Sequence, residues 1–558
     1  MPDPTTAEDP NPSDASSNAL APLRIPIFRA IWIASLGSNF GGLIQSVGAA
    51  WLMTSISTPQ MTALVQTSVT LPIMLLSLLA GAMADVFDRR RIMLAAQLFM
   101  LTVSVTLSVA AWQGWITPWT LLAFTFLIGC GTAFNNPAWQ ASVGDMVPRR
   151  DLIAAVTLNS MGFNLARSAG PAIGGAIVAA AGAAAAFAVN AVSYLALILV
   201  IFRWKPVRQQ QQVAREGLMH AVEGGVRYAA MSPRLHAVLL RAFLFGVGAS
   251  AVPALMPLVA RHTVAGGPLL FGVLLGAFGV GAVGGALISG RLRQRLTSES
   301  LIRRTAPAFA LAAVVVGFSP SLMLTLPALV VCGLAWILSL STFNVTVQMS
   351  VPRWVVARML AVYQMTTFGG MAAGAWIWGA LAQGAGIEVA HALSAAVLLV
   401  CTLVGLRWPL PRVDDLNLDP IMRWREPQTD VPILPRSGPV VISVEFRIRN
   451  EDVPEFLETM TERRRIRRRD GALGWTLSRD LADHEVWIER YAFPTWADYV
   501  RSNLRFTYDD AEASDHIRDL HVGPERPIVR RVIERSADPV EQSGRLLAEP
   551  LTDATRAS

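Results

Sequence analysis

The stretch Gly81-Ala-Met-Ala-Asp-Val-Phe-Asp-Arg-Arg-Arg91 stands between two long apolar segments. Residues 62–84 and 92–112 form these segments, and each has about the 20 apolar residues that a helix needs to cross a bilayer. Arginines in a short loop between two such helices favour the cytoplasmic side of the membrane. The stretch therefore predicts a cytoplasmic turn between two membrane-spanning helices.

The composition of the whole chain agrees with a membrane protein. Of its 558 residues, 53% are hydrophobic and 16% are charged, whereas a soluble globular chain has about 25% charged residues. Residues 1–408 carry 24 Lys and Arg against 12 Asp and Glu, and residues 409–558 carry 23 against 28. The chain is therefore a basic, apolar body with an acidic, polar tail. Its three cysteines lack the spacing of a metal site, so we expect no metal.

Scanning outward from this stretch gives twelve apolar segments that are long enough to cross a membrane. We predict an all-α polytopic membrane fold with twelve transmembrane helices. The predicted spans lie near residues 30–53, 62–84, 92–112, 118–141, 153–180, 183–202, 237–260, 268–289, 305–320, 322–347, 360–382 and 388–406.

Basic residues in the loops set the predicted orientation of these spans. The loops after spans 2, 4, 6, 8 and 10 hold nearly all of the loop arginines, and only Arg261 breaks the asymmetry. We therefore expect a multi-pass protein of the inner membrane with both termini in the cytoplasm. Charge spread over short loops also explains the positive net charge without a nucleic-acid surface, so we expect membrane lipid and no nucleic acid as partners.

The two halves of the body repeat at an offset of 204 residues. Gly81-Ala-Met-Ala corresponds to Gly285-Ala-Leu-Ile, and Val147-Pro-Arg corresponds to Val351-Pro-Arg. Glycines of span 5 also correspond to glycines of span 11. Because each half has an even number of spans, both halves have the same orientation, which predicts two parallel six-helix bundles around a central cavity.

On these residues the chain resembles the major facilitator superfamily over residues 28–408. Residues 81–91 are close to the family signature G-x-x-x-D-x-x-G-R-[KR], with Asp88 in place of the second glycine. The resemblance implies that the glycine allows close helix packing and that the first aspartate pairs with the arginine to hold the cytoplasmic side closed. The alternative is that these arginines serve only orientation. The predicted gate consists of Gly81, Asp85, Arg89, Arg90 and Asp145.

Span 5 carries a second pattern that the resemblance interprets. It contains Gly170-Pro171-Ala-Ile-Gly174-Gly175, which is similar to the antiporter motif of the superfamily's exporters. Glycines let this helix approach a partner helix closely, and proline bends it. The motif favours export over uptake.

Arg167 is the most informative single residue of the body. A charged side chain near mid-span costs a few kcal/mol unless it faces water or a partner. One polar stripe of span 5, which we expect to face the central cavity, consists of Ser160, Asn164, Arg167 and Pro171. In this position Arg167 would attract an anionic group of a substrate or take part in gating. An arginine satisfied by neighbouring helices is an equal alternative. Two weaker cavity candidates are the pairs Asn136 and Gln140, and Asn344 and Gln348.

The energy source is left open by the residues themselves. The middle of the spans contains no Asp or Glu, and His391, early in span 12, is the one titratable alternative, more simply explained as interfacial. Proton antiport is therefore implied by the resemblance alone. We expect no cofactor, and the proton gradient is the expected energy source.

The C-terminal part changes from membrane to globular patterning. Residues 437–535 predict the order βαββαβ, an α+β ferredoxin-like domain. This domain resembles antibiotic-biosynthesis monooxygenases, which pair through their sheets, so dimerisation through it is one expectation. The fusion is similar to the superfamily branch that contains the enterobactin exporter and macrolide efflux proteins. An enzymatic tail, with His484, Trp475 and Trp487 around a pocket, is the weaker alternative.

We therefore predict a secondary active exporter of amphipathic organic molecules, such as siderophores or macrolides, that works by alternating access and is not an enzyme. The first alternative is an uptake or facilitative carrier of the same fold. The second is a membrane-anchored enzyme or sensor that acts through its tail. The predicted parts are residues 1–27 (polar segment), 28–203 (first bundle), 204–235 (linker), 236–408 (second bundle), 409–436 (linker), 437–535 (ferredoxin-like domain) and 536–558 (disordered tail).

Overall fold

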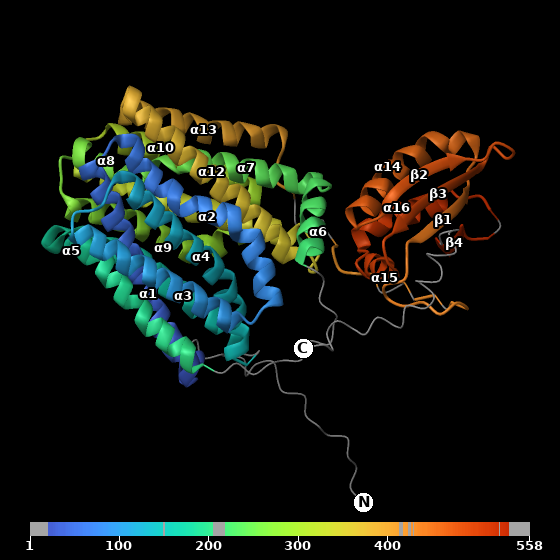
Figure 1. The fold of residues 1–558 in the computed structure, drawn as a ribbon. Coiled ribbons are helices and arrows are strands. Elements are labelled where there is room, and N and C mark those ends of the chain that lie inside the picture. Colours follow the sequence, from blue (N-terminus) through green and yellow to red (C-terminus); the bar gives the residue numbers. More distant parts are fainter. Residues whose placement is uncertain are drawn as a thin grey trace, which may run out of the picture. The chain divides into compact units, whose positions relative to one another are not determined.

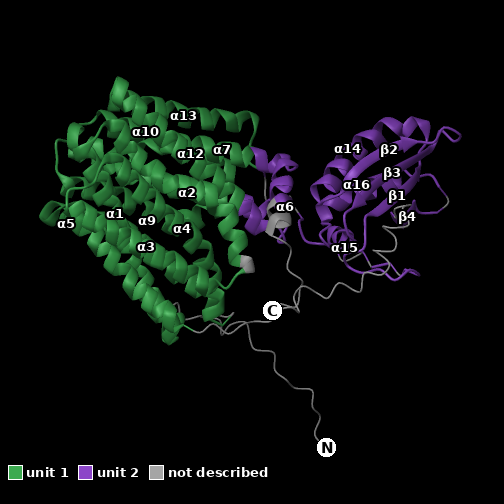
Figure 2. Cartoon of the chain, in the orientation of Figure 1, with its two compact units in different colours: residues 1–210, 237–345, 361–410 green, residues 211–236, 346–360, 411–558 purple. Residues whose placement is uncertain are grey.

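The chain divides into two compact units (Figures 1 and 2). The computed structural model describes residues 20–148, 151–204, 218–411, 417–421, 424, 426–427, 429–523 and 525–534. Unit 1 consists of Met1–Gln210, Ala237–Val345 and Ala361–Leu410, and unit 2 consists of Gln211–His236, Thr346–Leu360 and Pro411–Ser558. Most of the predicted N-terminal segment and the whole predicted disordered tail lie outside the described residues.

The first bundle is formed by five long helices of unit 1. Proline occupies the first turn of α1, α2 and α4, where its missing N–H removes no helical hydrogen bond. Thr58 and Thr117 cap α2 and α4, and Asp88 caps α3, because their side-chain oxygens accept hydrogen bonds from free backbone N–H groups. The helices are α1 Pro26–Ile56, α2 Pro59–Val86, α3 Arg89–Trp112, α4 Pro118–Met146 and α5 Leu152–Arg203, after a short 3-10 helix Ala21–Arg24.

Helix α5 contains two of the predicted spans in one helical element. It breaks at Gly182, whose φ of 78° is a conformation that glycine adopts without strain. The break lies between the predicted spans at residues 153–180 and 183–202. Two antiparallel crossings are therefore joined with almost no loop.

The second bundle contains the remaining long helices. Its first crossing is composite, since α7 continues into the short helix α8 and one π-helical turn, η4. The first turn of α7, the last turn of α11 and the first turn of α12 belong to unit 2. The elements are α7 Pro233–Ala249, α8 Ala251–Leu258, η4 Val259–Thr263, α9 Pro268–Arg295, α10 Ser298–Phe318, α11 Leu322–Met349, α12 Val356–Ala385 and α13 Ile387–Arg407.

The body is a membrane protein by the length and composition of these helices. Within the part of the chain that the structure describes, nine helical segments are long and apolar enough to cross a bilayer. Each of the twelve predicted spans has a counterpart in a helix of the structure. The number of twelve crossings stays a prediction.

Small and polar residues hold α1 against α5. An added Cβ at Gly48 would lie 3.0 Å from the Cβ of Ala186, so the two backbones approach closely there. Nearby, the buried side chain of Asn190 donates to Gln45 Oε1 and to Tyr194 Oη. Polar groups in a dry interior need such partners, so this network fixes how the two helices face each other.

A similar contact occurs in both bundles, although its two arginines are 213 and not 204 residues apart. Arg90 donates from Nε to the carbonyl oxygen of Ile201 at 3.0 Å, near the end of α5. In the second bundle, Arg303 Nη2 donates to the carbonyl oxygen of Gly405 at 3.1 Å, near the end of α13. Ile201 and Gly405 are 204 residues apart. In each bundle, an arginine near the start of the third crossing therefore holds the end of the sixth.

The C-terminal part folds around one four-stranded sheet. All its strand pairs are antiparallel, and the strand order is β2-β3-β1-β4. Alternate residues of β1, from Val440 to Phe446, are buried, and Phe446 packs against Phe456 of α14. The elements are β1 Val440–Arg447, α14 Val453–Arg469, β2 Leu473–Arg479, β3 Val486–Phe493, α15 Trp496–Leu504, α16 Tyr508–Asp519 and β4 Ile528–Ile533.

The elements of the C-terminal part follow the order β-α-β-β-α-α-β, so two helices, α15 and α16, stand where the predicted βαββαβ order has one. The assignment of this part to the ferredoxin-like class and its dimerisation stay predictions. Unit 2 also contains helix α6, Leu218–Ala230, which precedes α7 in the chain.

The contact between α9 and α11 generates a stability prediction. An added Cβ at Gly281 would overlap the carbonyl oxygen of Val330, whereas one at Gly284 would meet nothing within 4 Å. We expect Gly281→Ala to destabilise the fold by about 3 kcal/mol, because overpacking forces the two backbones apart. Gly284→Ala on the same helix is the matched control. Thermal unfolding in detergent measures both, and equal midpoints would contradict the packing described here.

Candidate functional site

Arg89 is the centre of the predicted gate. From the start of α3, its Nη1 donates to Asp145 Oδ2 at 2.9 Å and to the carbonyl oxygen of Ala141 at 3.0 Å. Its Nε also donates to the carbonyl oxygen of Ala84 at 3.4 Å. The side chain therefore joins the ends of α2 and α4, and Asp145 lies where the sequence placed it in the charge cluster. The side chain of Asp85 lies outside the described residues.

Gly81 differs from what the sequence predicted, and Asp88 has a structural role that the sequence analysis did not assign. An added Cβ at Gly81 would meet nothing within 4 Å, so the close helix packing expected at this glycine is wrong for this conformation. Asp88, which replaces the second glycine of the family pattern, accepts hydrogen bonds from the N–H groups of Arg90 and Arg91. An aspartate just before a helix is a common N-cap, and this signal could have predicted its structural role.

The glycines of the span 5 motif face two different helices. Gly170 and Gly174 lie against Leu43 and Ile44 of α1, inside the first bundle. Gly175 faces the second bundle, where an added Cβ would lie 2.6 Å from the carbonyl oxygen of Pro268 and 3.0 Å from Gly272 Cα. The two bundles therefore touch backbone to backbone at α5 and α9.

The polar stripe of α5 lies on the side of the helix that faces away from α1. On the α1 side, the carbonyl oxygen of Leu158 accepts a hydrogen bond from Trp32 Nε1 at 3.0 Å. On the other side, Ser160 is exposed, and Asn164 is half-buried and donates to the carbonyl oxygen of Ser160. The stripe is therefore free to face a water-filled cavity.

Arg167 continues this stripe at the boundary between the bundles. Its guanidinium lies 5.9 Å from the ring centre of Phe278 on α9, and Gly279 packs against its backbone. Among the described residues, Arg167 has no ion pair and no hydrogen bond from its guanidinium. The alternative of an arginine satisfied by neighbouring helices is therefore not supported. Such a cation can bind an anion that reaches its side chain beside the contact between α5 and α9.

The weaker cavity candidates are placed on α4 and α11. Asn136 and Gln140 are exposed one turn apart on α4. Asn344 is half-buried and Gln348 is exposed on α11, and each has a polar partner. Their membership of one cavity with Arg167 stays a prediction.

A second group of contacts joins the bundles near the start of α2. Arg261 Nη1 donates to the carbonyl oxygen of Thr54, and Thr67 Oγ1 donates to the carbonyl oxygen of Ala372 at 3.0 Å. Trp51 also stacks on Phe271 with ring centres 6.2 Å apart. Arg261, the exception to the loop asymmetry, is therefore a contact between the bundles. In the predicted orientation these contacts lie on the outer half of the membrane.

The structure places an ion network in the second bundle that the sequence analysis missed. The side chain of Arg241 is fully buried, and its Nη1 donates to Glu299 Oε2. Glu299 also accepts from Arg303 Nε at 2.7 Å and from the backbone N–H of Leu410 at 2.9 Å. The sequence feature that could have indicated this network is Arg241 itself, a charged residue inside the apolar run of predicted span 7.

His391 is a packed residue of the second bundle. Its ring is fully buried against Gly317 of α10, and Nδ1 lies 2.9 Å from the carbonyl oxygen of Ile387. Within the described part of the chain, Nε2 has no hydrogen-bond partner. The ring is therefore inside the protein, and its depth in the membrane stays a prediction.

The C-terminal residues that suggested an enzyme have separate surroundings. His484 is exposed in the turn between β2 and β3, whereas Trp475 Nε1 donates to the buried Glu489 at 2.9 Å. Burial opposes ionisation of Glu489, but Arg463 and Arg467 lower its pKa below the ordinary value. Ion pairs thus occupy the region between sheet and α14, and this arrangement gives no support to an enzymatic tail.

The ion network of the second bundle generates a testable prediction. Removing one partner of a buried ion pair leaves an uncompensated charge and costs about 3 to 5 kcal/mol. We therefore expect Glu299→Gln to lower the thermal unfolding midpoint strongly. Glu388→Gln, at an exposed glutamate of α13, is the control that should leave the midpoint unchanged. An unchanged midpoint in both variants would contradict a stabilising network.

Comparison with known proteins agrees with this architecture. Residues 17–538 match the major facilitator superfamily branch described as transmembrane secretion effector. The multidrug efflux pump Tap of Mycolicibacterium fortuitum is 25% identical over 404 residues, which cover 70% of this chain and 96% of Tap. Macrolide efflux protein A of Enterococcus faecalis is 22% identical over 212 residues, which cover 38% of this chain and 66% of that protein.

A solved structure supports the fold of the body. The crystal structure of a bacterial homologue of the human lysosomal transporter Spinster, inward-facing and occupied, has a TM-score of 0.56 at 13% identity. The match covers 69% of this chain and 97% of the chain in that structure. The family match extends over most of the chain, including the C-terminal fold. The chain therefore belongs to the transmembrane secretion effector family of the major facilitator superfamily.

Proposed function

We propose that this protein is a secondary active exporter of amphipathic, drug-like organic molecules. Two kinds of support are independent of each other. Relatives that match the chain are named as a multidrug efflux pump and a macrolide efflux protein. The body also contains a glycine contact between two bundles with a cation beside it, and transporters built from two repeats bind their substrates at the interface between the repeats.

The unpaired guanidinium of Arg167 is the observation that carries this proposal. A charge at this depth of the membrane is unfavourable, and the face of Phe278 offsets only about 1 to 2 kcal/mol of that cost. An anionic group on a substrate would supply the missing partner. The neighbouring aromatic ring would contact the apolar part of the same molecule. We therefore infer an amphipathic substrate with an anionic or catecholate group.

The transport cycle would use the α5–α9 contact as its pivot. Because Gly175 and Gly272 present no side chains, the two helices can roll over each other without losing contact. The contacts of Arg261 with Thr54 and of Thr67 with Ala372 would break when the outer side opens. The cytoplasmic pair of Arg89 and Asp145 would take part in closing the opposite side.

The antiporter-like glycines of α5 favour export over uptake, and the family resemblance favours coupling to inward proton movement. The arginines of the loops favour an inner-membrane protein with both termini in the cytoplasm. A named relative supports siderophores as one possible substrate class, without giving the direction of transport. The staphyloferrin A transporter of Staphylococcus aureus is 23% identical over 265 residues, which cover 47% of this chain and 64% of that protein.

Accumulation of a mixed panel of siderophores, macrolides and dyes tests the direction and the energy source. We expect cells of an efflux-deficient host that express the protein to accumulate less of at least one compound. A proton uncoupler should restore its accumulation. Higher accumulation in expressing cells would instead support uptake.

The role of Arg167 gives a sharper prediction. Arg167→Ala should reduce export of an anionic compound at least tenfold, because the binding charge is lost, whereas Arg167→Lys should retain part of it. Arg304→Ala removes an exposed arginine of the second bundle and is the matched control. Equal export by the Arg167→Ala variant and the control, at equal membrane abundance, would contradict the assigned role.

A further inference from the structure

The C-terminal fold contacts three short segments that belong to the membrane body by sequence. These segments are α6, the first turn of α7 and the connection between α11 and α12. All three belong to unit 2 together with the C-terminal fold, as Figure 2 shows in purple. The contacts between them are therefore internal to one compact unit.

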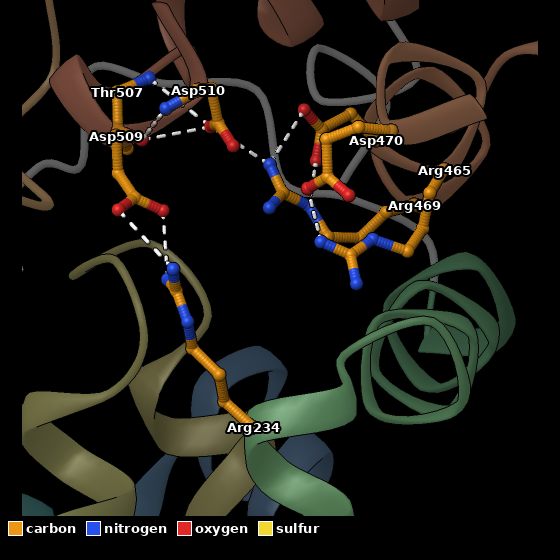
Figure 3. Close-up of polar contacts among 8 residues, drawn as sticks. Arg234, Arg465, Arg469, Asp470, Thr507, Asp509 and Asp510 are labelled. Carbon is orange, nitrogen blue, oxygen red and sulfur yellow. Dashed lines mark hydrogen bonds and ion pairs between the residues drawn. The ribbon is translucent and has the colours of Figure 1, made fainter. Parts of the chain in front are cut away.

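The first contact is an ion pair between two helix starts. Arg234, in the first turn of α7, donates from Nη1 to Asp509 Oδ2 at 2.7 Å and from Nη2 to Asp509 Oδ1 at 3.4 Å (Figure 3). Such a two-pronged pair fixes direction as well as distance. The Arg234 side chain is 48% exposed, so salt will weaken this contact.

The second contact places a buried cation against α6. Arg469, at the end of α14, is bound by Asp470 at 2.8 Å and by Asp510 at 2.9 Å (Figure 3). Its guanidinium also lies 5.1 Å from the ring centre of Tyr228 on α6, and its carbonyl oxygen accepts from Arg227 Nε at 3.5 Å. The Tyr228 ring is buried by this arrangement.

The third contact repeats the same chemistry at the connection between α11 and α12. The guanidinium of Arg505 lies 4.1 Å from the ring centre of Trp354. The Trp354 ring meets the ring of Tyr228 edge to face, with centres 5.6 Å apart. The two rings thus form one aromatic surface that receives two arginines of the C-terminal fold.

These contacts are polar and do not fill the space between the parts. A cavity of about 540 Å³ lies among them, lined by Tyr228, Arg234 and Ser350 on one side and by Glu462, Arg465 and His516 on the other. An interface that consists of ion pairs and stacked cations around a cavity resembles a transient protein–protein interface. An apolar core would instead have made the parts inseparable.

We propose that α6, the first turn of α7 and Trp354 form a docking surface for the C-terminal fold, which binds there without its covalent link and can be released. The partner that this surface fits is an arginine-bearing face with acidic neighbours, formed by α14, α16 and Arg505. Because α6 precedes the first crossing of the second bundle, release of the fold alters transport. This last consequence rests on the proposed function, whereas docking does not.

Cutting the chain between the two parts tests docking directly. A protease site is inserted between Pro411 and Asn417 of the full chain, and the C-terminal fold carries an affinity tag. After cleavage in detergent at low salt, we expect at least 80% of the membrane body to be recovered with the tagged fold. Arg234→Asp and Tyr228→Ala should each reduce this recovery at least fivefold.

Two further variants make the result specific. Arg234→Asp combined with Asp509→Arg should restore recovery, because the ion pair is rebuilt with opposite polarity. Asp515→Arg, at the exposed pair of Asp515 and Arg518 on the same helix α16, should leave recovery unchanged. Two results would contradict the docking surface. Either the membrane body is not recovered with the tagged fold of the cleaved wild type, or it is recovered equally with the tagged fold of every variant.

Export by the uncut variants tests the consequence. Arg234→Asp should change the export rate at least twofold, and the reversed pair should restore it. Release without any change in export would overturn the link to transport. The cleaved wild-type protein separates the two ideas. If its C-terminal fold stays bound but it exports no compound, the result contradicts the proposed function and still supports the docking surface.

Discussion

The close approach of α5 and α9 is the constraint on which the membrane body depends. Gly175 and Gly272 bring two backbones together where any side chain would separate them. In a bilayer there is little hydrophobic gain from packing helix on helix, so van der Waals contact between small residues must hold the bundles. This contact places Arg167 beside Phe278. It also leaves the two bundles free to tilt, because nothing interlocks at the glycines.

Three arginines inside membrane segments show three solutions to one electrostatic problem. Arg241 is neutralised by Glu299 inside the second bundle, and Arg261 donates to a backbone carbonyl of the first bundle. Arg167 has an aromatic neighbour and no anionic partner among the described residues. The first two arginines have partners inside the protein, and we propose that the third binds a ligand. We infer that the unsatisfied charge marks the transport path.

Local patterns predicted much of the fold, and contacts distant in sequence were mostly beyond them. Apolar runs located the helices, alternation located the strands, and Gly182 explains how spans 5 and 6 share one helix. The motif predicted a pair between Arg89 and Asp85, with Asp145 as a further member of the cluster, and the structure pairs Arg89 with Asp145. The Arg241 and Glu299 pair was missed, because a hydropathy scan treats residue 299, just before predicted span 9, as loop. The docking of Arg234 on Asp509 joins residues 275 apart and has no local signal.

The central claim is that the bundles separate on their outer side while α5 and α9 stay in contact. Cysteines introduced at Thr54 and Arg261, in a chain without its native cysteines, allow a reducible bifunctional thiol reagent to tie the outer contact shut. Export of a panel compound is then measured before cross-linking, after it and after reduction. The account predicts that cross-linking abolishes export and that reduction restores it. Undiminished export by the cross-linked protein would contradict it.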